Sequence, residues 1–234
     1  MIAVEICTPS RASAEAALRG GARRIELCRD LHCGGLTPAD ADIDYCVRSL
    51  GLRTHVLVRP RPGNFCYSPA EVAAIEDTIH RCKALGAAAV VVGFLTPDGR
   101  VNEALTRRMV QLAAPMEVTF HRAFDEARQD PLEALQAVIA SGCHRLLTSG
   151  QAPTALEGAA VIGRLVEYAR HSTPATRHFH ILAGSGVTPD TVGPLVARTG
   201  VAEVHGSCKT SLPDGTVQTD ERAVRQLMTL AATL

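Results

Sequence analysis

A short motif occurs four times along this chain of 234 residues: a glycine, a few small or polar residues, and then a β-rich run. The copies are GARRIELC from Gly21, GAAAVVVG from Gly86, GCHRLLTSG from Gly142 and GVAEVHGS from Gly200. Each glycine fits the position just after a helix, and each following run fits a short parallel strand. The repetition therefore predicts that helices and buried parallel strands alternate.

Four further strand-like runs lie between these motifs: AVEIC from Ala3, THVLVRP from Thr54, MEVTF from Met116 and HFHILA from His178. Eight strands alternating with helices over 234 residues predict a TIM (β/α)8 barrel, slightly shorter than the typical ~250 residues. No linker or change in composition divides the chain, so we expect one domain over residues 1–234. An open doubly wound sheet is the rival, but the first strand leads into Cys7-Thr8-Pro9-Ser10 rather than a GxGxxG turn.

Capping signals that place proline in the first helical turn follow most of the runs. They are Thr8-Pro9-Ser10, Thr37-Pro38, Ser68-Pro69, Asp130-Pro131 and Thr188-Pro189.

Composition narrows the class of protein. Lys plus Arg equal Asp plus Glu at 24 each, which gives no support for a nucleic-acid partner. No apolar run reaches the ~18 residues of a membrane helix, and the first residues are typical of a strand rather than a signal peptide. The eight cysteines form no CxxC pair, so we expect reduced thiols and a cytoplasmic location.

Side chains in a barrel strand alternate between the interior and the helix layer. The apolar alternation turns Glu5, Glu26, Arg59, His121 and His205 inward, and Ser149 lies at the end of the sixth strand. We expect these groups to meet at the C-terminal mouth, where barrel enzymes keep their active sites. Paired charges survive burial, so either glutamate is expected to pair with Arg59, and a structural ion-pair network is the alternative explanation.

The loop Ala183-Gly184-Ser185-Gly186-Val187 leads into a helix, a place where barrels often bind phosphate. A tight turn without a ligand is the other interpretation. The predicted anion-binding residues are Arg59, Arg61, Arg122, Ser149, Gly184, Ser185, Gly186, His205, Ser207 and Lys209. The candidate proton-transfer residues are Glu26, His121 and Glu5.

Cys7 and Cys28 end neighbouring strands at equivalent inward positions. Adjacent strands lie about 4.8 Å apart, so the two sulfurs are within reach of one soft ion such as Cu(I). Two buried reduced cysteines also need no metal. The pair His178-x-His180 is a weaker candidate, because its spacing is not that of a zinc site.

Long blocks of the chain resemble the CutC family of copper homeostasis proteins. The blocks are GGARRIELC with GGLTP, HVLVRPRPGNFCYS, GFLTPDGRV, VTFHRAFD, DPLEAL and LLTSGQ. The resemblance implies a TIM barrel, a cytoplasmic location, frequent homodimers and Cu(I) ligation by Cys7 and Cys28. The chain departs from the family pattern at AGSG, where a triple glycine is common, and at PGN after the two arginines.

Three functions follow as hypotheses. The first is cytosolic Cu(I) binding by Cys7 and Cys28. The second is an enzyme of unknown reaction that acts on a small phosphorylated or carboxylated metabolite at the barrel mouth. The third is a scaffold built on an inert barrel.

Overall fold

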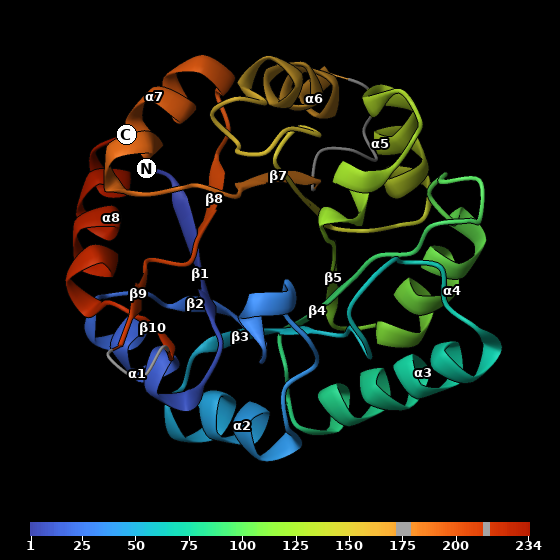
Figure 1. The fold of residues 1–234 in the computed structure, drawn as a ribbon, viewed down its shortest axis with the longest axis horizontal. Helices are drawn as coiled ribbons and strands as arrows, with labels where there is room; N and C mark the ends of the chain where they lie inside the picture. The colour runs from blue at the N-terminus through green and yellow to red at the C-terminus, as the bar shows by residue number, and fades with distance from the viewer. Residues whose placement is uncertain (172–178, 213–215) are drawn as a thin grey trace.

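The computed structural model describes residues 1–171, 179–212 and 216–234. Eight parallel strands pair in chain order and close into a barrel through β8 and β1, and helices surround them (Figure 1). The strands are β1 (Ala3–Thr8), β2 (Arg24–Leu27), β3 (Arg53–Leu57), β4 (Ala89–Val92), β5 (Glu117–Phe120), β6 (Arg145–Thr148), β7 (His180–Gly184) and β8 (Glu203–Gly206). The predicted (β/α)8 barrel is confirmed.

Within the described ranges, eight α-helices follow the strands, with short helical turns between some of them. The helices are α1 (Arg11–Arg19), α2 (Asp40–Asp44), α3 (Pro69–Ala84), α4 (Glu103–Ala113), α5 (Pro131–Ala140), α6 (Ala159–His171), α7 (Pro189–Thr199) and α8 (Glu221–Thr233). The turns are η1 (Leu31–Cys33), η2 (Tyr45–Ser49) and η3 (Arg122–Glu126). None of the described helices is long and apolar enough to cross a membrane.

Most of the predicted helix starts are confirmed. The Ser68 hydroxyl accepts a hydrogen bond from the Glu71 backbone N–H, the Glu71 carboxylate accepts one from that of Ser68, and Pro69 is the first residue of α3. Asp130 caps α5, and Thr188 precedes Pro189 at the start of α7. These caps satisfy backbone N–H groups that have no partner inside the helix.

The prediction for Thr37-Pro38 was wrong. Helix α2 begins at Asp40, after Ala39, which makes no side-chain cap. Thr37 is instead held to β3, because its hydroxyl accepts from the Arg59 backbone N–H and donates to the Arg59 carbonyl.

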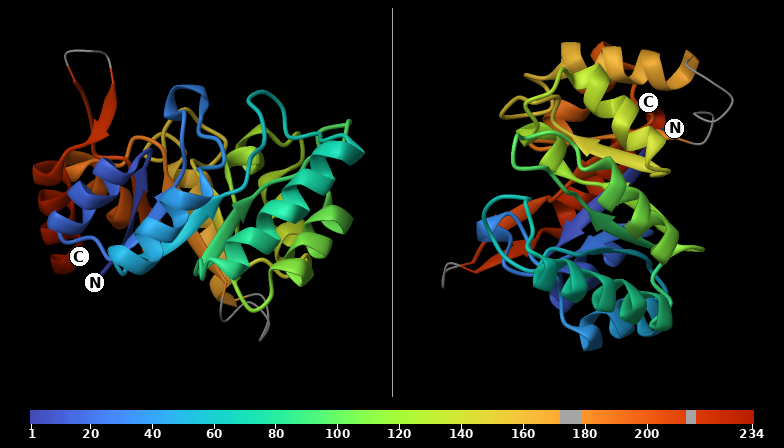
Figure 2. Two further views of the ribbon diagram at one scale, coloured as in Figure 1. Left: turned by 90° about the horizontal axis from the view of Figure 1, so that it is seen from below. Right: turned by 90° about the vertical axis from the view of Figure 1, so that its right-hand side faces the viewer.

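The segment after β8 and the start of β7 also call for comparison with the sequence-based expectation. A hairpin of β9 (Lys209–Ser211) and β10 (Val217–Thr219) follows β8 and projects from the barrel (Figure 2). Nothing in the sequence pattern predicted it. Strand β7 begins at His180, and His178 lies outside the described residues.

The predicted alternation of side chains is confirmed along the strands. Ile6, Ile25 and Val118 belong to the large core between barrel and helices. A second, smaller apolar cluster lies inside the barrel and contains Cys7, Cys28, Leu57 and Val91. Odd and even positions therefore face opposite walls, and the polar residues between the apolar ones point inward.

The lower part of the barrel holds an ionic network. Arg24 Nη2 lies 2.7 Å from Glu203 Oε2, and Arg145 bridges Glu203 at 3.1 Å and Glu117 at 2.5 Å. Because Glu203 and Arg145 are almost fully buried, each charge requires its partner. The ion-pair network that the sequence left open as an alternative concerned the mouth residues Glu5, Glu26 and Arg59. The pairs described here were not predicted, and they lie below that mouth.

Candidate functional site

A cavity of about 650 Å³ opens at the C-terminal ends of the strands, within the range of small-molecule sites. Strand ends, the β7–α7 loop and the residues after β8 contribute its walls. Its lining includes Cys7, Glu26, Leu31, Leu57, Arg59, Phe65, His121, Arg122, Leu147, Ser185, Gly186, Val187, Thr188, His205, Ser207, Cys208 and Lys209.

Two thiols meet at this end of the barrel. Cys7 Sγ lies 3.8 Å from Cys28 Sγ, and both side chains are buried. The contact with Cys28 and burial raise the pKa of Cys7 well above its usual value. At neutral pH Cys7 is therefore a protonated thiol.

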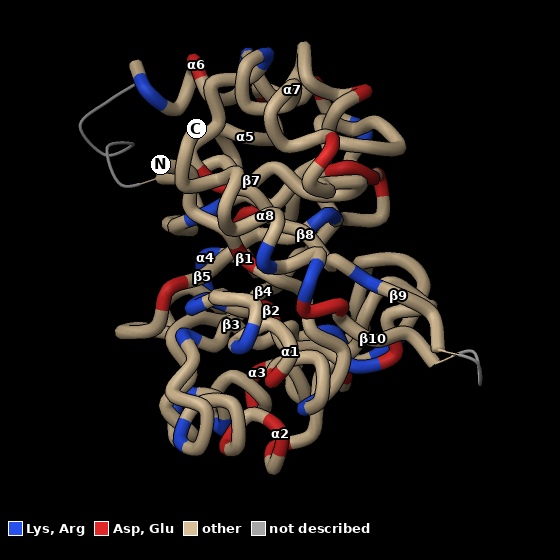
Figure 3. Tube along the Cα trace, turned by 90° about the vertical axis from the view of Figure 1, so that its left-hand side faces the viewer, with Lys and Arg blue, Asp and Glu red and all other residues tan. Residues whose placement is uncertain are grey.

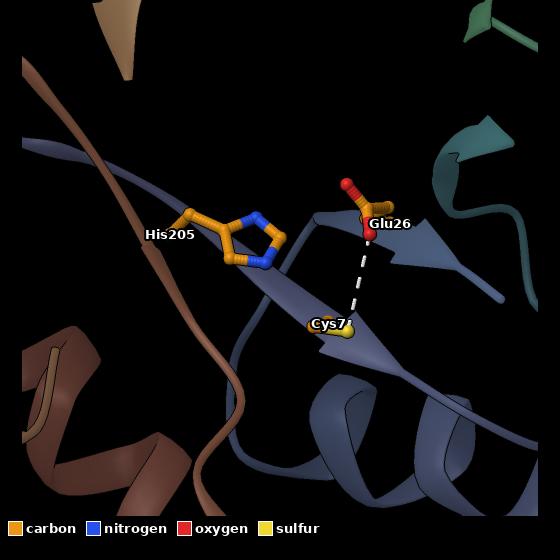
Figure 4. Close-up of side chains that lie close together, drawn as sticks. All are labelled: Cys7, Glu26 and His205. Carbon is orange, nitrogen blue, oxygen red and sulfur yellow. Dashed lines mark hydrogen bonds between the residues drawn. The ribbon is translucent and has the colours of Figure 1, made fainter. Parts of the chain in front are cut away.

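Glu26 and His205 complete a cluster with Cys7 (Figure 4), their ligand atoms lying within 4.8 Å of one another. The three residues come from β2, β8 and β1, and register places Cys7 opposite Glu26. Burial raises the pKa of Glu26 to about 7, with Glu5 adding to the effect and His205 opposing it. Thiol, carboxylate and imidazole are all metal-binding groups.

Glu5 lies one layer deeper and orients His205. Its Oε1 is 3.0 Å from His205 Nδ1, and its Oε2 is 2.6 Å from His55 Nδ1. Burial lowers the pKa of His205, but Glu26, Cys7 and Glu5 outweigh it and hold that pKa well above the usual value. A carboxylate on Nδ1 leaves Nε2 of this imidazole as the atom available to a ligand.

His121 presents a neutral imidazole to the cavity. Its Nδ1 accepts a hydrogen bond of 3.1 Å from the Ala123 backbone N–H, so Nε2 carries the proton. Burial, and then the charge of Arg59, lower the pKa of His121 to about 3. The Nε2–H group has no hydrogen-bond partner among the described residues, which makes it a free donor in the cavity wall.

Arg59 lies beside it without a carboxylate. Its guanidinium donates to the carbonyls of Cys33, Gly35 and Gly63 and lies 5.0 Å from the Phe65 ring centroid. The expected pairing with Glu5 or Glu26 was wrong, because these backbone carbonyls occupy the guanidinium instead. Arg59 is 7% exposed, and the described residues place no carboxylate within ion-pair distance of it.

The β7–α7 loop forms the opposite part of the lining. Ser185 and Gly186 both have left-handed backbone conformations, with φ of 79° and 72°. This bend brings residues 185–189 to the cavity, where α7 begins. A helix start presents backbone N–H groups and the positive end of its dipole.

Comparison with known proteins agrees with these features. The family model described as the CutC family matches residues 2–210. The chain belongs to the CutC family. A family protein CutC of Chromobacterium violaceum is 45% identical over 88% of this chain and 81% of its own length. One from Porphyromonas gingivalis is 39% identical over 93% of this chain and 90% of its own length.

A solved structure supports the same assignment. CutC from Streptococcus agalactiae, named for copper homeostasis, superposes with a TM-score of 0.81 at 29% identity. The match covers 88% of this chain and 99% of that one. The CutC family and its barrel are thus established for this chain by sequence and by structure.

Ten predicted site residues contribute to the cavity of this CutC family member. They are Cys7, Glu26, Arg59, His121, Arg122, Ser185, Gly186, His205 and Ser207, and Lys209 joins them at the rim. Cys28 contacts Cys7 from the adjoining strand. Alternation along the strands, together with the position of the β7–α7 loop, was sufficient to bring these residues together.

Four other predicted residues lie outside the lining. Glu5 is fully buried below it, and Gly184 leaves the space that Leu147 and His205 fill. Ser149 donates to the Ala152 carbonyl and lies against Asp125. Arg61 is held by Glu71 at 2.5 Å. Their neighbours within the chain satisfy these polar groups.

Phe65 is a site residue that the sequence analysis missed. Its ring centroid lies 4.8 Å from that of His121, and Arg59 lies across the same ring. The available signal was the pair of aromatic residues in the polar loop RPRPGNFCYS, Phe65 and Tyr67, because aromatics are only 3% of the chain. His55, whose Nδ1 lies 2.6 Å from Glu5 Oε2, is a second residue that was given no role from the sequence.

Proposed function

We propose that this CutC family protein binds Cu(I) through the thiolates of Cys7 and Cys28 and serves copper homeostasis in the cytosol. The observation that carries the proposal is the 3.8 Å contact between the two sulfurs at the edge of an open cavity. Thiolates are the ligands that Cu(I) prefers. The family resemblance names the same two cysteines.

The spacing of the sulfurs favours a bent arrangement. Two metal–sulfur bonds of about 2.3 Å each, the length found for zinc thiolates, span 3.8 Å with a sulfur–metal–sulfur angle of roughly 110°. Such an angle leaves room for a third ligand. His205 is the candidate through Nε2, because Glu5 holds its Nδ1 as carboxylates commonly do behind metal-binding histidines.

Binding must displace protons. The raised pKa of Cys7 means that its thiol loses a proton when the metal enters, and a protonated His205 must do the same before it becomes a ligand. Glu26 lies 4.0 Å from the Cys7 sulfur and is the nearest described carboxylate that can accept the thiol proton.

A cytosolic location and a homodimer are part of this proposal, and the resemblance to the family supports both. The enzyme alternative gains nothing from the relatives, which are named only as CutC family proteins or for copper homeostasis. Copper binding is therefore the function that the site and the family favour together.

Removal of the two thiols tests the proposal. The variant carrying Cys7→Ser and Cys28→Ser is expected to lose stoichiometric Cu(I) binding against a chromophoric Cu(I) chelator under reducing conditions. Circular dichroism and the denaturation midpoint confirm that the barrel is folded. A serine hydroxyl fills nearly the same space but is a poor ligand for a soft ion.

The matched control removes two thiols elsewhere. Cys33 and Cys66 donate to the carbonyls of Asp30 and Leu95, and serine preserves both hydrogen bonds. The variant with Cys33→Ser and Cys66→Ser should bind one equivalent of Cu(I), as the unmodified protein does. Unchanged uptake by the folded Cys7→Ser, Cys28→Ser variant would exclude these ligands.

A further inference from the structure

The cavity above the thiols carries an excess of positive charge. Arg59, Arg122 and Lys209 belong to its lining, and Glu26 is the single carboxylate there. Asp125 neutralises Arg122 at 2.8 Å but is not part of the lining, and Arg59 lacks a carboxylate among the described residues. The balance of charge suits an anion larger than a metal ion.

Three polar atoms in the walls have no hydrogen-bond partner among the described residues: Arg59 Nε, His121 Nε2 and Glu26 Oε2. Their side chains are 5–7% exposed. Leaving a buried donor or acceptor unpaired costs free energy comparable to the hydrogen bond it lacks. All three residues line one cavity, although the unpaired atoms themselves are buried. A ligand would therefore pair with them, and recover that cost, once these side chains turn into the cavity.

The polar groups in each part of the cavity wall determine which chemical group of a ligand can bind there. Arg59 and the His121 Nε2–H group are donors, so they select a carboxylate or another oxygen acceptor. Glu26 selects a hydroxyl or amino donor. Ser185, Gly186 and Val187, just before α7, share the cavity lining with Lys209, and backbone N–H groups ahead of a helix start select a phosphate. The Thr188 N–H does not take part, because it donates to the Thr191 hydroxyl.

We propose that this cavity is a binding site for a small hydroxylated phosphate monoester that also carries a carboxylate. The phosphate binds at residues 185–187 and Lys209, the carboxylate binds Arg59 and His121, and a hydroxyl donates to Glu26. The proposal does not depend on copper binding, since Cys7 and Cys28 supply none of these contacts.

The probe is 3-phosphoglycerate, which carries all three groups. Its fragments are inorganic phosphate, glycerol 3-phosphate without the carboxylate, and glycerate without the phosphate. At ten times the dissociation constant, 3-phosphoglycerate should raise the Tm by about 3–5 °C. Each fragment should bind at least about tenfold more weakly, as measured by calorimetry.

The phosphate wall is tested by a matched pair of variants. The Ser185 hydroxyl donates to the Pro153 carbonyl, so its side chain is not a ligand, and both Asp and Asn tolerate its left-handed backbone. Ser185→Asp places a negative charge next to the bound phosphate. It should weaken the binding of 3-phosphoglycerate at least tenfold relative to Ser185→Asn. Equal binding by the two variants would exclude this loop.

The carboxylate wall is tested at His121. His121→Phe keeps a ring against Phe65 and removes the Nε2–H donor. The substitution should weaken the binding of 3-phosphoglycerate about tenfold. It should leave the affinity for glycerol 3-phosphate unchanged, and Cu(I) binding should persist. If both esters lost affinity equally, the ligand carboxylate would not bind at His121.

The two proposals can fail separately. The Cys7→Ser, Cys28→Ser variant should retain the response to 3-phosphoglycerate, whether or not the unmodified protein binds copper. If neither 3-phosphoglycerate nor its phosphate-bearing fragments shift the Tm or give heat at millimolar concentration, the proposed site is wrong.

Discussion

Glu5 shows how one buried carboxylate organises its surroundings. It is fully buried, and its two oxygens lie 3.0 Å from His205, 2.6 Å from His55 and 3.2 Å from Arg24. Burial alone would raise its pKa, but His55, His205 and Arg24 outweigh that effect and hold the pKa well below its usual value. Glu5 is therefore an ionised carboxylate that connects the ion pairs of the lower barrel, through Arg24, to His205 in the site.

Glu5→Gln should destabilise the protein by about 3–5 kcal/mol, because the substitution leaves buried cations without their counter-charge. The measurement is urea denaturation at neutral pH. Glu117→Gln is the matched control: its side chain is 32% exposed, so solvent screens the loss and the cost should stay near or below about 1 kcal/mol. Equal costs for the two variants would contradict the role assigned to Glu5.

The placement of Glu5 also marks the limit of sequence reasoning at this scale. Alternation along β1 predicts that Glu5 and Cys7 share a wall, and both do face inward. It does not say how deep each one lies, since depth depends on the stagger of neighbouring strands. Register places Glu5 beside His205 and Cys7 beside Glu26, so only Cys7 reaches the cavity.

Individual elements were predictable where local chemistry decides them. Ser68-Pro69 and Asp130-Pro131 mark helix starts because a capping side chain and a proline both favour that position. Thr37-Pro38 carries the same signal, yet tertiary contacts with Arg59 use the threonine instead. The β9–β10 hairpin was missed because three-residue strands leave almost no periodicity.

The end of β4 offers a prediction at the scale of elements. A Cβ at Gly93 would lie 2.3 Å from the His121 ring and 2.8 Å from the Ala123 Cβ, so β4 approaches η3 closely only because this residue is glycine. Gly93→Ala should therefore cost about 1–3 kcal/mol of stability through overpacking. Because the substitution displaces the His121 ring, it should also weaken the binding of 3-phosphoglycerate.

The same substitution in α6 is the control. At Gly163 the nearest atom to an added Cβ is the Arg198 carbonyl oxygen at 3.6 Å, an ordinary contact. Gly163→Ala should stabilise the protein by about 0.5–1 kcal/mol, because alanine favours a helix interior. Denaturation midpoints measure both, and a change of the same sign for the two would contradict the packing argument.

At the scale of the whole molecule, barrel closure turns eight local patterns into one site. Register and alternation bring Glu26, His121 and His205 to one end, although they are far apart in sequence. Basic and acidic residues are interspersed along the Cα trace (Figure 3), which agrees with the balanced composition. The sequence could not reveal which groups Arg59 contacts, because backbone carbonyls carry no side-chain signal.

Glu26 and His121 change the stability of the protein in opposite directions as the pH falls. Glu26, with its pKa raised to about 7, makes the folded state bind more protons, so its contribution makes the protein more stable as pH falls from about 7 to the ordinary pKa of the group. His121, with its pKa lowered to about 3, acts in the opposite direction. Below its ordinary pKa of about 6.5, the unfolded chain protonates this histidine and the folded protein does not.

His121 should therefore cost the protein about 2 kcal/mol of stability between pH 6.5 and pH 5. The measurement compares unfolding free energies of the unmodified protein and His121→Phe at the two pH values. Because Glu26 is present in both, its contribution cancels, and the difference between the proteins should shift by that amount in favour of His121→Phe. His171→Phe, at a histidine 73% exposed, should give no comparable shift. Parallel pH profiles for the unmodified protein and His121→Phe would show that His121 is not held neutral by burial.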